Sequence, residues 1–149
     1  MTTIAYKNGV LAGDRRAVAN GWIMPGTLTK VFKGEADGVE FLLGLVGYPE
    51  EAMVVVNTLL QNGQPPESFE LSDGCRVIMI RGHSSDITVF EGKATFTLKM
   101  TGDFFAFGSG GPVALGALHA GASAKQAVVI ASVYDGNTGS DVDTVQFGK

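Results

Sequence analysis

The start of the chain holds residues whose types and order suit nucleophilic hydrolysis. Thr2 follows Met1, and Lys30 lies sixteen residues after Asp14. If Met1 is removed, Thr2 carries a hydroxyl nucleophile and a free α-amine that can act as its base. The ordinary pKa of an α-amine, about 7.7–8.0, leaves a fair share neutral at working pH, and a nearby lysine lowers that pKa further. Thr2 beside a lysine that an aspartate holds would therefore be an amine-assisted threonine nucleophile.

A predicted hairpin brings two of these residues together. Residues 3–6 and 10–13 flank a turn at 7–9, whose Asn8-Gly9 pair tolerates the positive φ of a tight turn. Pairing the two strands places Asp14 close to the chain start. The simpler interpretation of Thr2 is a β-branched residue that opens an edge strand.

A glycine-rich segment, Gly108-Ser109-Gly110-Gly111, stands where a predicted strand becomes a predicted helix. Backbone N–H groups at such a place can hold an anion. The segment lacks the Lys-Ser/Thr of a phosphate-binding loop, and Phe107 occupies the position of the first glycine in a nucleophile elbow. Taken alone, the segment is better interpreted as a tight turn.

The remaining pattern predicts an α+β fold. Further strands are predicted at 30–33, 39–46, 76–80, 87–91, 94–101, 104–107 and 142–147, and helices at 49–62, 112–119 and 124–134. Residues 17–29 are a predicted loop with a short extended piece at 22–24, residues 34–38 a polar turn, and residues 64–73 a connecting loop. The helices exclude an all-β sandwich, and the hairpins exclude a parallel doubly wound fold.

The totals narrow the classes of function. A chain of 149 residues with 45% apolar and 17% charged residues predicts one domain, residues 1–149, with a substantial core. A net charge of −4 argues against nucleic acid as a partner, and Arg15-Arg16 is better interpreted as a solvated strand end than as a binding patch. Without a bilayer-length apolar run or a leader pattern, a membrane partner is not predicted.

The cysteine and histidine content argues against a disulfide and against a metal site. Cys75 is the single cysteine, which excludes an internal disulfide and agrees with a reducing, cytoplasmic location. His83 and His119 lack ligand-type spacing, so no metal is predicted. His83 is expected in an exposed turn, and His119 near a helix C-terminus, where its charge favours the dipole.

The residues at the chain start and the later glycine motifs jointly resemble the proteasome β subunits, and more closely the bacterial HslV peptidase, a family of N-terminal-nucleophile hydrolases. The matching segments are Thr2-Thr3-Ile4-Ala5, Gly13-Asp14, Lys30, Gly44-Leu45-Val46-Gly47, Gly108-Ser109-Gly110-Gly111 and Asp135-Gly136-Asn137-Thr138-Gly139. The last segment resembles an Asp-x-x-Ser-Gly motif with Thr138 in place of the serine. The resemblance covers nearly the whole chain in the right order.

The resemblance implies a four-layer αββα sandwich, in which helices flank two antiparallel sheets, and a threonine-type peptidase. Thr2 would be the nucleophile, with Lys30 and its partner Asp14 tuning the amine. The Gly47 N–H would stabilise the oxyanion, while Ser109, Asp135 and Thr138 would hold the amine and a water. The implied substrate pocket is lined by Ala17, Leu28, Leu45 and Pro49, which favours an apolar side chain.

The resemblance also implies partners. These are further copies in a homo-oligomeric ring or double ring, polypeptide substrates, and a separate ATP-driven unfoldase; the sequence has no ATP motif of its own, and no cofactor is expected. Two departures count against full equivalence. The chain is shorter than the family's usual subunits, with only residues 64–73 where a second long helix is expected, and a retained Met1 would block the site. A catalytically silent structural or assembly subunit and a small-molecule amidase therefore stay as alternatives.

Overall fold

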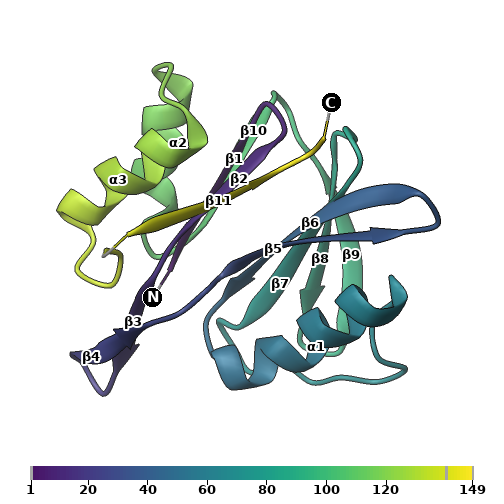
Figure 1. The fold of residues 1–149 in the computed structure, drawn as a ribbon. Helices are drawn as coiled ribbons and strands as arrows, with labels where there is room; N and C mark the ends of the chain where they lie inside the picture. Colours follow the sequence, from purple (N-terminus) through teal and green to yellow (C-terminus); the bar gives the residue numbers. More distant parts are fainter. Residues whose placement is uncertain (1, 140, 149) are drawn as a thin grey trace.

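The computed structural model describes residues 2–139 and 141–148, and these form two antiparallel sheets, a separate hairpin and three helices (Figure 1). The four-stranded sheet has the order β10-β1-β2-β11, and the five-stranded sheet has the order β5-β6-β7-β8-β9. The strands are β1 (Thr3–Lys7), β2 (Val10–Asp14), β3 (Arg16–Ala19), β4 (Trp22–Thr27), β5 (Val31–Ala36), β6 (Val39–Val46), β7 (Arg76–Arg81), β8 (Asp86–Glu91), β9 (Ala94–Lys99), β10 (Phe104–Gly108) and β11 (Val142–Gln146); the helices are α1 (Pro49–Asn62), α2 (Gly111–His119) and α3 (Ala124–Tyr134).

The opening hairpin is confirmed. Asn8 and Gly9 both have positive φ, at 51° and 82°, and β1 pairs with β2 in a register that sets Ile4 opposite Gly13. On its other side β1 pairs with β10, Thr3 lying opposite Gly108. Because β1 has partners on both sides, it is an inner strand, and the interpretation of Thr2 as the opening of an edge strand is wrong.

The two sheets face each other across an apolar core, with Ile4 and Leu11 on one side and Leu42 and Ile78 among the residues on the other. Side chains of β6 alternate, so that Leu42 and Val46 enter this core while Phe41, Leu43 and Leu45 face α1. The strand is therefore buried on both faces, as its continuous apolar run predicts.

The helices cover the outer faces of the sheets. Helices α2 and α3 pack against β1 and β2 through small residues, including Ala114 and Ala127, which allow close approach. Helix α3 begins at a capping box between Ser123 and Gln126. Among the described residues, α1 is the helix on the five-stranded sheet: residues 64–73 contain no helix, although their Leu71 is buried in the core that α1 covers. That side is thinner, as the short sequence between α1 and β7 predicts.

Two predicted connections are wrong, and one predicted strand is shorter than expected. Residues 17–29 are not a loop, because β3 and β4 form a hairpin about Asn20-Gly21, with φ of 51° and 82°. This hairpin projects away from the two sheets, and Trp22 is 54% exposed. Because the hairpin does not bury one face, its sequence lacks the alternation of apolar and polar residues that predicts a strand. The predicted polar turn at 34–38 is largely strand β5, and the strand predicted at 94–101 ends at Lys99.

Glycine content explains the error at β5. Gly34 lies opposite Phe41, and a Cβ on Gly34 would approach the Phe41 ring to 2.5 Å. The glycine therefore makes room for a neighbouring ring within the strand, and the turn itself follows at Asp37-Gly38, with φ of 54° and 76°. None of the described helices has the length and apolar character needed to cross a membrane.

Candidate active site

Thr2 lies at the entrance to β1, directly beside the glycine-rich segment that follows β10. Its side chain is buried, at 1% exposure, and its backbone N–H donates to Ser109 Oγ at 3.2 Å. Gly108 has φ of 100°, and a Cβ there would overlap the Thr2 carbonyl. The glycine thus permits the close approach that places Ser109 next to Thr2.

The hairpin delivers Asp14 to the same place. The Asp14 carboxylate is fully buried and accepts from the Thr3 N–H at 3.0 Å and from Lys30 Nζ at 3.0 Å to each oxygen. The N–H groups of Arg16 and Gly139 donate to its second oxygen, each at 3.2 Å. Asp14 is therefore fixed by several segments at once, and it ties Lys30 to the backbone next to Thr2.

Lys30 is a buried charge whose position depends on this carboxylate. The residue is 2% exposed and directly precedes β5. Burial lowers the pKa of its amine, and the charge and hydrogen bonds of Asp14 offset that effect only in part. A lysine with a lowered pKa and a buried partner beside a proposed nucleophile is the kind of perturbed group that gathers at functional sites.

A second carboxylate, that of Asp135, holds Ser109 and Thr138. Asp135 Oδ2 accepts from Ser109 Oγ at 2.6 Å and from Thr138 Oγ1 at 2.5 Å. Burial by itself would raise the pKa of Asp135, but these bonds and one from the Asn137 N–H outweigh it and lower that pKa. Asp135 therefore stays ionised and holds Ser109 beside Thr2.

Two residues to which the sequence analysis gave no role at the site, Thr3 and Arg16, complete the network. Thr3 Oγ1 lies 2.6 Å from Thr138 Oγ1, which links β1 to the loop after α3. Arg16 donates from Nη1 to the carbonyls of Gly136 and Thr138. A Cβ on Gly139 would overlap the Arg16 guanidinium.

Arg16 thus binds the 136–139 loop and is not a solvated strand end. Arg15 directly follows the end of β2, as predicted, and its partly exposed side chain forms a salt bridge from Nη1 to Asp143 at 2.6 Å. The signal for Arg16 was its position two residues after Asp14.

Gly47 lies across a small cavity from Ser109. The cavity measures about 230 Å³ and is lined by Val46, Gly47, Gly74, Arg76, Gly108 and Ser109. Gly47 has φ of 97°, and a Cβ there would come within 2.6 Å of the Cys75 Cα. The structure therefore brings the predicted oxyanion donor and the predicted amine-holding serine to one concave surface.

None of the four residues predicted to line a substrate pocket lines this cavity. Ala17 lies on the projecting hairpin, and Leu28 follows it, its N–H bonded to the Arg15 carbonyl at 3.0 Å. Leu45 is fully buried against α1, and Pro49 opens that helix. It is Val46, the neighbour of Leu45, that lines the cavity.

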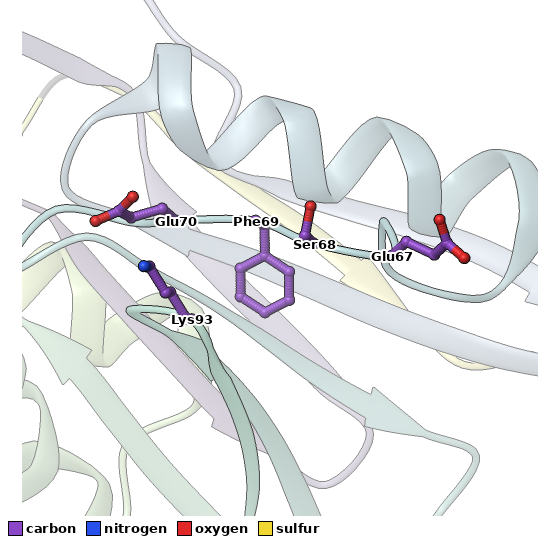
Figure 2. A pocket seen from close by; sticks show the side chains of 5 residues that line it. All are labelled: Glu67, Ser68, Phe69, Glu70 and Lys93. Carbon is purple, nitrogen blue, oxygen red and sulfur yellow. The ribbon is translucent and has the colours of Figure 1, made fainter.

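A larger cavity, of about 460 Å³, lies elsewhere and offers different chemistry. Figure 2 shows its lining residues, Glu67, Ser68, Phe69, Glu70 and Lys93, along the segment beneath α1 and at the turn between β8 and β9. None of the predicted catalytic residues lines it. Among the described residues, no group of His, Cys, Asp and Glu side chains could hold a metal ion.

Comparison with known structures defines the class of fold. No family model matches the sequence, and no curated protein does. The chain nevertheless has the fold of the proteasome β-like N-terminal-nucleophile hydrolases, over nearly its whole length. The resemblance stated from the sequence motifs is confirmed at the level of the fold.

Three solved structures illustrate the similarity. The eukaryotic HslV of Trypanosoma brucei superposes with a TM-score of 0.71 at 19% identity, covering 97% of this chain and 98% of that one. The BPH of Thiobacillus denitrificans, solved in complex with epoxomicin, gives 0.65 at 18%, covering 97% and 96%. The Anbu of Pseudomonas aeruginosa, solved as a helical assembly, gives 0.69 at 11%, covering 99% and 81%.

Proposed function

We propose that this chain is a threonine-type peptidase of the N-terminal-nucleophile kind, active once Met1 is removed. The observation that carries the proposal is the convergence on Thr2 of hydrogen bonds organised by two carboxylates, Asp14 and Asp135. Asp14 binds both Lys30 and the Thr3 backbone, while Asp135 holds the Ser109 hydroxyl that accepts from the Thr2 backbone N–H. A purely structural role does not require a buried lysine beside the first strand.

The proposed reaction follows from these positions. The Thr2 hydroxyl attacks the substrate carbonyl, and its proton passes to the α-amine of the same residue. The Gly47 N–H stabilises the oxyanion, a type of contact typically worth about 3 kcal/mol. The departing amine takes the proton, and a water held near Ser109, Asp135 and Thr138 then hydrolyses the ester. Asp14 keeps Lys30 in place, and Lys30 favours the neutral amine.

The architecture proposed for this site is the αββα sandwich of a single domain. It is supported by the three separate cores, which lie between α1 and the five-stranded sheet, between the two sheets, and between the four-stranded sheet and α2 with α3. Because the Anbu structure is a helical assembly, we propose that copies of this chain associate. The ring or double ring, and a separate ATP-driven unfoldase that supplies polypeptide substrates, are proposed from the sequence resemblance. Native mass spectrometry measures the number of copies.

Intact-mass spectrometry before and after incubation with epoxomicin tests the peptidase proposal. A species without Met1 should gain one inhibitor mass, and Thr2→Ala should abolish the gain because it removes the hydroxyl. Thr29→Ala, at an exposed threonine, is the matched control and should react fully. Retention of Met1 throughout, with no adduct, would contradict the proposal.

The alternative function is that of a catalytically silent subunit of the same fold. The observation that favours it is the burial of Thr2, which is 1% exposed. Such a subunit would assemble with copies or partners yet form no adduct in any preparation. Met1, on which this alternative depends, lies outside the described residues.

A further inference from the structure

Among the described residues that line the cavity between Gly47 and Ser109, Arg76 is the one that carries a charge. Arg76 opens β7, where it pairs with Val46 on one side and with Glu91 on the other. Side chains of β7 alternate, and Ile78 and Ile80 face the four-stranded sheet. By the same alternation Arg76 faces that sheet, at the end of the strand where the proposed site lies.

Two contacts position the guanidinium. Its Nη2 lies 2.7 Å from Glu91 Oε1, and its Cζ lies 5.9 Å from the centre of the Phe107 ring. Phe107 immediately precedes Gly108-Ser109, so Arg76 reaches from the five-stranded sheet to the strand that carries the serine. The guanidinium is held in one place at the cavity rather than extended into solvent.

These contacts do not use up the binding capacity of the guanidinium. A guanidinium has five N–H donors, and its Nε here is buried with no hydrogen-bond partner among the described residues. The side chains of Arg76 and Glu91 are 33% and 41% exposed, so their pair is a surface salt bridge of small energetic value. Stability alone is a weak reason for an arginine at this position.

We propose that Arg76 is a specificity-determining residue that binds a carboxylate of the substrate, carried by the residue directly before or directly after the cleaved bond. The inference rests on the proposed peptidase function, because the cavity is where Gly47 and Ser109 meet. A planar guanidinium binds a carboxylate through parallel N–H donors, which a carboxamide cannot match. The acidic preference replaces the apolar preference expected from Ala17, Leu28, Leu45 and Pro49.

Matched fluorogenic peptides that carry Glu or Gln on either side of the cleaved bond provide the test, with the Met1-free full-length chain. The wild type should favour Glu over Gln by on the order of tenfold in kcat/KM, mainly through KM, on one side of the bond. Arg76→Met should bring that ratio close to one, and Arg76→Lys should restore part of it. Glu91→Gln removes the competing carboxylate and should keep or increase the preference.

Two outcomes overturn the inference: a wild type without the Glu preference, or an Arg76→Met variant that retains it. Thermal unfolding of each variant checks that the fold is intact, and a loss of the wild-type preference at high salt gives support that needs no variant. Epoxomicin adduct formation separates the two proposals. An adduct without a Glu preference contradicts only the role of Arg76, whereas a wild type with neither adduct nor turnover contradicts the peptidase proposal and this inference together.

Discussion

At the scale of single residues, the site depends most on how Asp14 is bound. Three backbone N–H groups, from Thr3, Arg16 and Gly139, point at its carboxylate in addition to the Lys30 amine. A buried ion pair adds little net stability, since desolvation offsets its attraction, but removal of either partner leaves a buried group uncompensated. The two partners are not equivalent, because only Asp14 also satisfies backbone donors.

Lys30→Met should therefore cost about 3 kcal/mol of unfolding free energy, and Asp14→Ala should cost more, since it strands the Lys30 charge and three N–H donors. Both variants should lose the epoxomicin adduct. Lys33→Met is the control: Lys33 pairs with Glu40 at 2.8 Å on the surface and should matter by less than about 1 kcal/mol. Urea unfolding measures the unfolding free energies of the three variants. A Lys30→Met variant with full peptidase turnover would contradict the role given to Lys30.

Sequence reasoning reached most of this site but not all of it. Thr2 and Asp14 were found because the hairpin signal and the family resemblance agreed, whereas Lys30 was found through the resemblance alone. Thr3 and Arg16 were missed because their roles depend on the 136–139 loop, which the sequence does not place beside β1. Arg76 was missed because an arginine at the start of an alternating strand does not show which cavity it lines.

At the scale of elements, the glycines between β10 and α2 act by leaving space. Gly110 has an ordinary φ of −88°, so its backbone does not require glycine. A Cβ there would nevertheless overlap Thr3 Oγ1 and lie 3.0 Å from Thr138 Oγ1. The start of α2 can approach β1 only because this position has no side chain.

Gly110→Ala should therefore lower the melting temperature and reduce adduct formation, because it displaces Thr3 or Thr138. Gly116→Ala is the matched control within α2, where a new Cβ meets nothing within 4 Å. That substitution should stabilise the protein by about 0.5–1 kcal/mol through helix propensity. Differential scanning calorimetry measures the melting temperatures of both variants. Equal changes in melting temperature would show that the space at Gly110 is unimportant.

Elements were predictable where periodicity and turn chemistry agreed. The opening hairpin has an Asn-Gly turn between apolar runs, and α1 has Pro49 at its start and Gly63, with φ of 73°, at its end. The hairpin of β3 and β4 also has an Asn-Gly turn, at Asn20-Gly21, but β3 is only half-buried and β4 is exposed along its length. Its pairing is local, and no burial pattern distinguishes it from a loop.

At the scale of the whole molecule, the site is assembled from both sheets. Thr2 and Asp14 come with the four-stranded sheet, whereas Lys30 and Gly47 flank strands of the five-stranded sheet. The α+β class followed from the order of predicted elements, but how the two sheets face each other did not. That arrangement depends on close approaches between residues distant in the sequence. One of them joins Gly44 to Ile4, whose Cγ2 would lie only 3.1 Å from a Cβ added at Gly44.

The rate at which the single cysteine is modified can measure motion at the cavity. Cys75 is fully buried, donates from Sγ to the Tyr48 carbonyl at 3.5 Å, and underlies Gly47. Burial raises the pKa of its thiol, and only the thiolate reacts, so a thiol reagent should modify the protein only when the neighbouring segment opens.

The rate of that modification then reports the opening of the Gly47 segment in the unmodified chain. A ligand that occupies the cavity should slow the reaction, whereas mild denaturant should accelerate it well before the molecule unfolds. Stopped-flow measurement with an aromatic disulfide gives the rate, and reaction as fast as that of a free cysteine would show that the segment is open at rest. The modification rate of Cys75, which has no part in the proposed reaction, thus reports how often the segment that carries Gly47, the proposed oxyanion donor, opens.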